Sequence, residues 1–231
     1  MAGLAAGTLR ATPRLICKLN GQDINLGGRS MAVSGSERDQ LRPRRGRPRS
    51  EQTRLAVLRA TSELMHEVGM RVMTTEEIAR RSGASKATIY KWWPSKYAVA
   101  VEALLSEMLI ASDDPDTGSA REDFRITLAG LIHFYTGPSG RVFAQLVGEA
   151  QYDPLIAAEL RDRLVGSRRR LVRAIWVRGV ARGELRPDVD PEAAIDLVFG
   201  PAMYRLVAGH APLDDAAADA IVDAAFRGLA A

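Results

Sequence analysis

Residues Thr74–Lys96 read TTEEIARRSGASKATIYKWWPSK, and this stretch decides the fold. Its first half has helical spacing, after which Gly83 interrupts the helical pattern. Ser85 can cap a second helix, in which Ile89 and Trp93 lie four residues apart on one side. The other positions of this second helix are largely polar or basic. Two short helices joined by a tight glycine turn, the second with a polar outer face, are typical of a helix-turn-helix.

The overall composition is that of a globular protein with one basic region. The chain has 231 residues, 46% of them hydrophobic, and its single cysteine excludes an internal disulfide framework. No apolar run approaches the ~20 residues that cross a bilayer, and no signal-peptide pattern is present, so we expect a cytoplasmic protein without membrane contact. Residues 38–96 carry 14 basic and 6 acidic side chains, against 14 and 20 in residues 97–231. This asymmetry suggests that the first region meets phosphate.

The N-terminal residues 1–41 show no sustained periodicity and are rich in Gly, Ser, Thr and Arg. This composition predicts a disordered extension. We also hypothesise that translation begins at Met31, so that residues 1–30 do not belong to the native protein. Intact-mass measurement on protein from the native host tests this, and a mass for the full chain would exclude it.

Residues 42–49, RPRRGRPR, form an arginine-rich arm that cannot be the interior of a helix. Its centre resembles an AT-hook, in which arginines enter a narrow A·T minor groove, and Arg45 and Arg47 would make these contacts. The alternative is a solubilising arm or one that binds phosphate without sequence preference. The position directly before a helix-turn-helix makes the two interpretations about equal, because homeodomain arms act from the same place.

Helical periodicity and stop signals predict an all-α fold of about nine helices without strands. The segments with this pattern are 50–68, 74–82, 86–92, about 95–110, 124–135, 142–147, 153–180, 191–206 and 217–229. Gly69 is the expected stop of the first helix, whose buried stripe ends at Val68. Thr74 and Glu77 form a capping box at the start of the second. A kink is expected at Gly166.

The order of arm, three-helix unit, long linking helix and five mostly apolar helices resembles the TetR (tetracycline-repressor) family of bacterial transcription regulators. The resemblance is strongest in residues 74–96 and covers about residues 46–110 by motif, with the remainder matching by helix count. It implies an arm and DNA-binding domain over residues 42–96, and a helical ligand-binding and dimerisation domain over residues 97–231. It further implies a homodimeric repressor that binds a palindromic operator and is released by a small lipophilic molecule.

The family pattern also implies roles for the residues of the DNA-reading unit. Three residues match positions that face base edges: Lys86, Ala87 and Lys91. The lysine at the last position suggests a guanine contact at O6 or N7. Five residues match positions that reach phosphate: Thr74, Thr88, Tyr90, Trp92 and Lys96. Trp92 departs from the residue type common at its position, so its role is left open.

The family usually keeps a ligand cavity among the helices of residues 124–206, which would suit a lipophilic molecule. The expected lining is His133, Phe134, Phe143, Leu146, Glu149, Trp176, Phe199, Met203 and Tyr204. Plain core packing is the alternative for each of these residues. The run Arg168–Arg170 with Arg173 is expected to be a solvated face or to form salt bridges between helices, with a site for an acidic ligand as the alternative.

The last two expected helices, 191–206 and 217–229, are poor in polar residues for helices exposed on their own. Their alanines allow close approach of another helix. A four-helix bundle formed with a second copy is therefore expected, because a two-fold pair of recognition helices reads a palindrome. The alternative is internal packing. The expected partners are thus double-stranded DNA, a small-molecule effector and a second copy of the chain.

Catalytic and metal sites are not expected. His66, His133 and His210 lie far apart in the sequence without carboxylate or cysteine partners nearby, and no nucleophile elbow or phosphate-binding glycine loop is present. We therefore expect neither an enzyme nor a cofactor. Two other functions stay open: an architectural DNA-binding protein with little sequence preference, and a helical small-molecule-binding protein without an operator.

Overall fold

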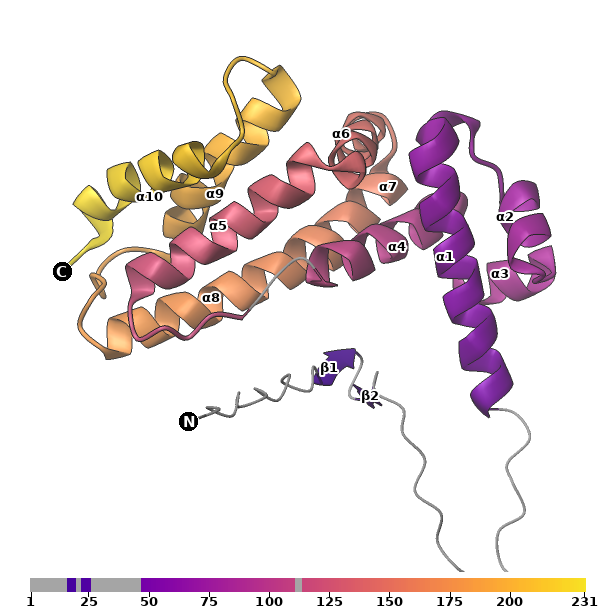
Figure 1. The fold of residues 1–231 in the computed structure, drawn as a ribbon, viewed down its shortest axis with the longest axis horizontal. Helices are drawn as coiled ribbons and strands as arrows, with labels where there is room; N and C mark the ends of the chain where they lie inside the picture. The colour runs from indigo at the N-terminus through magenta and orange to yellow at the C-terminus, as the bar shows by residue number, and fades with distance from the viewer. Residues whose placement is uncertain (1–15, 20–21, 26–46, 111–113) are drawn as a thin grey trace, which may run out of the picture. The chain divides into compact units, whose positions relative to one another are not determined.

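The computed structural model describes residues 16–19, 22–25, 47–110 and 114–231. The chain divides into two compact units, Met1–Arg44 and Arg45–Ala231 (Figure 1). In the first unit, strands β1 (Ile16–Leu19) and β2 (Gln22–Asn25) pair antiparallel. These eight residues are the described part of residues 1–41, so the disordered extension that the composition predicts there stays a prediction. In the sequence the two strands are separated by an Asn-Gly pair, which favours two-residue hairpins.

The second unit is helical, and its elements follow the predicted order. They are α1 (Arg47–Val72), α2 (Thr75–Ser82), α3 (Lys86–Trp92), α4 (Lys96–Ile110), α5 (Ala120–Thr136), α6 (Pro138–Ala150), α7 (Pro154–Glu159), the π-helical turn η1 (Leu160–Val165), α8 (Gly166–Ala181), α9 (Pro191–Ala208) and α10 (Asp215–Leu229). Because α7, η1 and α8 are contiguous, the described residues contain nine helices when these three are counted as one. A turn of π-helix ends directly before Gly166, whose own φ and ψ are helical, so the kink expected there stays a prediction.

The start of α1 corrects the sequence prediction. The helix begins at Arg47, so Ser50 lies inside it and does not cap it. Pro48 is tolerated because it falls in the first turn, where the missing N–H has no helical partner to lose. The stop at Gly69 is confirmed, since its φ of 76° and ψ of 169° are not helical. Val68, expected on the buried stripe, is 42% exposed.

The caps that the sequence predicts around α2 and α3 are confirmed. The Glu77 N–H donates to Thr74 Oγ1 over 3.2 Å, and the Thr88 N–H donates to Ser85 Oγ over 3.1 Å. Gly83 ends α2 in the left-handed region at φ 69°, a conformation that glycine adopts at little cost. Local sequence therefore fixes the turn that sets the angle between α2 and α3.

A single hydrophobic core runs through the second unit, from α1 to α10. The central element is α4, in which Ala98 to Val101 have no exposed surface. One side of α4 packs against α1, and the other packs against α6, α7 and η1 (Figure 1). We call α1–α3 the reading head and α5–α10 the body, with α4 shared between them. No helix in the described part of the chain is long and apolar enough to span a membrane.

Candidate nucleic-acid interface and effector cavity

One side of α3 is buried and the other is exposed, as its sequence predicts. Ile89 and Trp93 are each 1% exposed and pack into the core of the reading head. Four residues predicted to contact DNA lie on the exposed side: Lys86, Ala87, Tyr90 and Lys91. Thr88 is half-buried, and Thr74 is exposed at the start of α2. Arg45 lies outside the described residues, as does the side chain of Arg47, so the arm stays a prediction.

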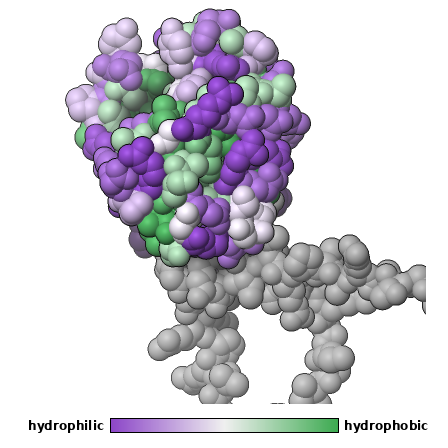
Figure 2. Space-filling model, turned by 90° about the vertical axis from the view of Figure 1, so that its left-hand side faces the viewer, coloured by the Kyte–Doolittle hydropathy of each residue, from purple (hydrophilic) through white to green (hydrophobic). Residues whose placement is uncertain are grey.

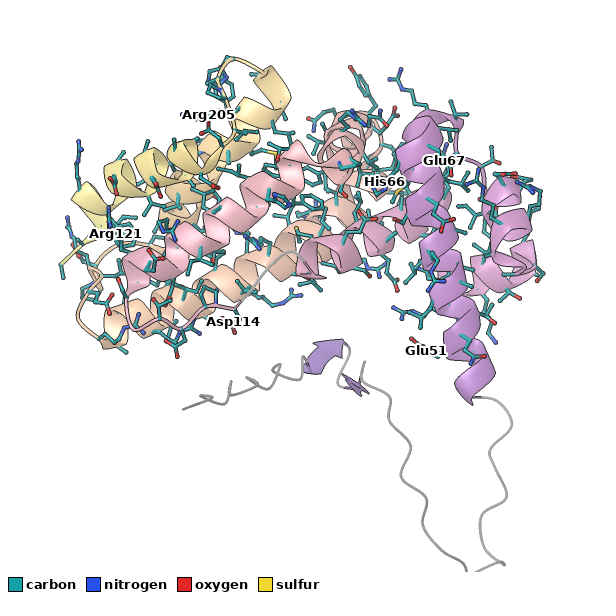
Figure 3. The ribbon with its side chains drawn as sticks, in the orientation of Figure 1. Glu51, His66, Glu67, Asp114, Arg121 and Arg205 are labelled. Carbon is teal, nitrogen blue, oxygen red and sulfur yellow. The ribbon has the colours of Figure 1, made fainter. Side chains whose placement is uncertain are left out.

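Ion pairs on the reading head hold α2 in place and leave a basic edge on α3. Arg81 binds Glu67 of α1 over 2.8 Å and Glu77 over 3.1 Å (Glu67 is labelled in Figure 3). Hydrogen bonds from Arg80 and Arg81 lower the pKa of Glu77 to about 2. Lys86 pairs with Glu76, and this bond lowers the carboxyl pKa. Both partners are largely exposed, so the bond can be exchanged at little cost for one to DNA.

Lys96 is placed differently from the phosphate contact that the family pattern implies. Its ammonium donates to the carbonyl oxygens of Met70 at 2.9 Å, Met73 at 3.0 Å and Arg71 at 3.3 Å. A lysine ammonium has three donors, so these bonds account for all of them. Lys96 therefore fastens the end of α1 to the start of α4, and a phosphate contact would require one of these bonds to be exchanged.

The two tryptophans at the end of α3 have different surroundings. Trp92 is partly buried against the core, and its ring meets that of Trp93 edge-to-face, with centroids 5.5 Å apart. Trp93 is buried, and its Nε1–H donates to Glu102 Oε2 over 2.7 Å. The phosphate contact predicted for Trp92 stays a prediction, whereas Trp93 connects the recognition helix to α4.

Glu102 is the centre of a buried polar cluster that joins the reading head to the body. Its carboxylate accepts from Trp93, from Arg54 of α1 and, over 2.6 Å, from Arg163 of η1. Burial alone would raise the pKa of Glu102, but the bonds from Arg163 and Trp93 and the nearby arginine charges outweigh it and lower the pKa. The sequence analysis missed this cluster. The available signal is a lone carboxylate in the apolar run AVAVEALL.

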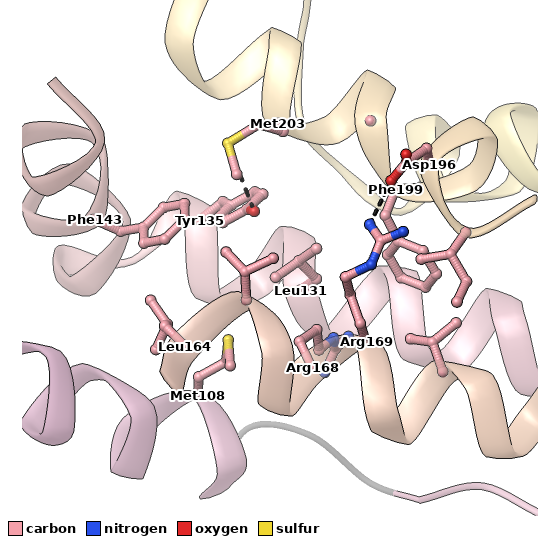
Figure 4. Close-up of a pocket in the computed structure, with 14 residues that line it drawn as sticks. Met108, Leu131, Tyr135, Phe143, Leu164, Arg168, Arg169, Asp196, Phe199 and Met203 are labelled. Carbon is pink, nitrogen blue, oxygen red and sulfur yellow. Dashed lines mark hydrogen bonds and ion pairs between the residues drawn. The ribbon is translucent and has the colours of Figure 1, made fainter. Parts of the chain in front are cut away.

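The body contains a cavity of about 250 Å³ (Figure 4). It lies among α4, α5, α6, η1, α8 and α9, and its walls are mostly apolar. The lining residues are Met108, Leu131, Tyr135, Phe143, Leu164, Val165, Arg168, Arg169, Val172, Ile195, Asp196, Phe199, Gly200 and Met203. The cavity thus lies among the helices of residues 124–206, where the family resemblance predicts a ligand cavity.

Three of the nine predicted lining residues border this cavity: Phe143, Phe199 and Met203. Three others are buried without bordering it, namely Phe134, Leu146 and Trp176. His133 and Tyr204 are exposed, and Tyr204 lies against the ring of His210. Glu149 binds Arg71 at 3.0 Å instead. Periodicity identifies the buried face of a helix, but it cannot say which buried residues border a void.

The polar groups of the cavity come from α5, α8 and α9. Arg168 is 8% exposed and donates to the Thr127 carbonyl, and its guanidinium carbon lies 5.8 Å from the centre of the Phe199 ring. Burial lowers the pKa of Arg168 to about 10, so it stays charged at neutral pH. Burial also raises the pKa of the Tyr135 hydroxyl, which therefore stays protonated. Tyr135 stacks on Phe143 with ring centroids 5.4 Å apart.

The arginine run of α8 divides into two kinds of residue. Arg169 donates to Glu192 over 2.6 Å and also pairs with Asp196, while Arg173 pairs with Glu192. These bonds are the salt bridges between helices that the sequence predicts, and they tie α8 to α9. Arg168 is instead buried in the cavity wall, so the alternative of an acidic-ligand site remains open for it.

Comparison with known proteins gives matches over most of the chain. Residues 57–103 match the family model of bacterial regulatory proteins of the tetR family, and residues 114–225 match the tetracyclin repressor-like C-terminal domain. The HTH-type transcriptional regulator YdeS of Bacillus subtilis is 38% identical over 191 residues, which are 83% of this chain and 96% of that protein.

Solved structures show the same fold. The TetR family transcription regulator SCO0332 is 36% identical and has a TM-score of 0.71, with 77% of this chain and 98% of that chain covered. The regulator FadR from Bacillus subtilis, solved in complex with stearoyl-CoA, has a TM-score of 0.58 at 16% identity, with 75% and 98% covered. At that identity the second likeness shows the fold alone.

Proposed function

Because the chain belongs to the TetR family of bacterial transcription regulators, we propose that it is a homodimeric repressor of a palindromic operator, released by a small lipophilic molecule. The observation that carries this proposal is the division of α3 into a side buried by Ile89 and Trp93 and an exposed basic side. An exposed helix face with lysine and tyrosine donors fits the major groove. The cavity in the body supplies a place for the effector.

A second copy of the chain fits the exposed apolar side of α9 and α10. Large apolar residues on α9 are exposed to unusual degrees: Leu197 at 51%, Tyr204 at 65% and Val207 at 59%. On α10 the exposed residues Ala216, Ala220, Ala224 and Gly228 recur every four positions, which allows a close helix approach. From the end of the body where α10 lies, hydrophobic residues are visible between hydrophilic ones (Figure 2). These surfaces support the proposed four-helix dimer interface.

The dimer can be tested by charging this surface. We expect the double variant Leu197→Asp, Tyr204→Asp to sediment as a monomer in analytical ultracentrifugation and to lose operator binding. Val177→Asp is the matched control, because Val177 is a large apolar residue of α8 with a similar exposure of 60%. A double variant that remains dimeric would place the interface elsewhere.

The route from the cavity to the recognition helix is short. Leu164 and Val165 of η1 line the cavity, and the neighbouring Arg163 binds Glu102, which also holds Trp93. π-Helical turns inside α-helices are frequent at functional sites. We propose that the effector binds more tightly to a conformation in which η1 and α4 have shifted, which changes the position of α3 in the dimer.

Selection of bound genomic DNA by the full-length chain, followed by footprinting, tests the operator. We expect a discrete protected palindrome, whose half-sites lie about one or more helical turns apart. A spread protection pattern would instead support an architectural DNA-binding protein. An absence of any retained DNA would support a small-molecule-binding protein without an operator. The genes beside the selected sites would identify what is regulated.

A further inference from the structure

We infer that the molecule accepted by the cavity is a compact amphiphile with a single acidic group, held by Arg168 and Tyr135. This inference rests on the proposed effector role of the cavity and narrows the class of ligand. It develops the alternative of an acidic-ligand site, which remained open for Arg168. The observations behind it are the size of the cavity, its apolar walls and the kind of polar group that faces it.

The size of the cavity limits the ligand. A cavity of about 150 Å³ lined by aliphatic and aromatic side chains holds benzene, and this one measures about 250 Å³. It therefore has room for a single ring with a short chain, or a branched aliphatic body of similar bulk. Leu131, Leu164 and Ile195 offer apolar contact to such a body. A long acyl chain or a coenzyme A group exceeds this volume.

The polar groups that face the cavity determine the charge of the ligand. Arg169 and Asp196 neutralise each other at its border, and Arg169 binds Glu192 as well. The interior wall presents the guanidinium of Arg168, which also donates to the Thr127 carbonyl, and the hydroxyl of Tyr135, which lies 4.0 Å from Met203 Sδ. Both groups donate hydrogen bonds, and the guanidinium fork matches the two oxygens of a carboxylate. A ligand that complements this wall must therefore supply acceptor oxygens.

The low polarity of the surroundings strengthens this preference. Arg168 packs against Phe199 and is almost entirely removed from solvent. An anion placed beside a buried cation gains more than it would in water, whereas an ammonium group would be repelled. Arg169, the next residue on α8, binds two carboxylates and ties α8 to α9.

The test compares three probes that share one ring and chain. The full-length dimer is titrated with 3-phenylpropionate, 3-phenylpropan-1-ol and 3-phenylpropylamine by calorimetry and thermal shift. We expect the acid to bind on the order of tenfold more tightly than the alcohol, since a bond to a charged group adds roughly one such factor. The amine should bind most weakly. In Arg168→Gln the advantage of the acid over the alcohol should disappear, and in the matched variant Arg169→Gln it should persist.

Equal binding of the acid and the alcohol would overturn the inference, as would an advantage that survives in Arg168→Gln. Binding of none of the three probes would overturn the proposed size class. If Arg168→Gln does not fold, Tyr135→Phe serves instead and should reduce the advantage of the acid severalfold. Release of operator DNA is measured separately. If the acid binds in an Arg168-dependent way but does not release operator DNA, the effector role is excluded and the ligand class stands. If the chain binds its operator but shows no preference for the acid, the ligand class is excluded and the proposed regulator function stands.

Discussion

The recognition helix and the cavity use burial in opposite ways. On α3 the side chains proposed to contact DNA are exposed, while Ile89 and Trp93 on the opposite side are buried. In the body the side chains that matter surround a void, and Arg168 and Tyr135 are nearly inaccessible. The first region needs a rigid surface at a fixed helical spacing. The second needs helices that can separate, so a signal between them must pass through links that both regions share.

Two of the links that join the regions differ in character. The first is Glu102, a buried carboxylate that holds Arg54, Trp93 and Arg163. The second lies at the end of α1, where the Met70 N–H donates to the Gln145 side chain of α6 over 3.1 Å. One link is charged and buried, and the other is neutral and near the surface. Removing each link separately shows how much the two regions depend on each other.

The largest effect is expected from Glu102→Ala. Removal of this carboxylate leaves two arginines and the indole of Trp93 without their shared acceptor, and breaking a buried ion pair in this way costs about 3–5 kcal/mol. The free energy of unfolding from urea titration should fall by that amount, and operator affinity should fall with it. Glu149→Ala is the control, because Glu149 binds the exposed Arg71 and should contribute ~1 kcal/mol or less.

A smaller effect, confined to DNA binding, is expected from Lys91→Ala. Lys91 is exposed on α3, so its removal should leave the free energy of unfolding nearly unchanged. On the preferred operator the affinity should fall by about 1–3 kcal/mol, and sequence choice should relax at one base step. Binding measured against a set of single-base operator variants decides this. An equal loss on every sequence would mean that Lys91 contacts phosphate.

The two regions also differ in how far the sequence predicts them. The caps at Thr74 and Ser85 and the turn at Gly83 depend on short local patterns, so their prediction from sequence is confirmed. The predicted start of α1 at Ser50 was wrong, because the first turn of a helix tolerates proline and α1 includes Pro48. Local signals of this kind predict helix order well and helix ends less well.

The cavity and the Glu102 cluster depend on contacts between residues far apart in the chain. Arg54 and Arg163 are separated by more than one hundred positions, and only the packing of α1, α4 and η1 brings both to Glu102. The lining of the cavity is equally hard to predict from the sequence. Phe134 and Phe143 are both buried phenylalanines, and only Phe143 borders the cavity. Hydrophobic pattern predicts which side of a helix is buried, and the packing of whole helices decides where space remains.

The next prediction concerns Gly69→Ala, which perturbs the neutral link between Met70 and Gln145. Gly69 has a φ of 76°, and an added Cβ would lie 3.2 Å from the Gln145 Oε1 that accepts from Met70. At φ 76° and ψ 169° the backbone lies in a region essentially restricted to glycine, which costs an alanine roughly 1–3 kcal/mol, and displacement of Gln145 adds to this. The free energy of unfolding should fall by about that amount. Gly148→Ala is the control, because its φ is not positive and an added Cβ would meet nothing. A similar loss in both variants would show that backbone strain at Gly69 is unimportant.

The smallest effect concerns the dependence of stability on pH, and it separates the buried link from the surface pairs. The pKa of Glu102 is lowered from 4.5 in the folded chain, so its contribution is complete above 4.5 and is lost as the pH falls through the folded value. The pKa of Glu77 is lowered as well, but its arginine pairs are exposed and salt screens them. In high salt, the loss of stability of the wild type at low pH should therefore still include a contribution from Glu102. That contribution should be missing in Glu102→Gln. If the two proteins lose stability in parallel, Glu102 titrates normally and the cluster does not hold its charge.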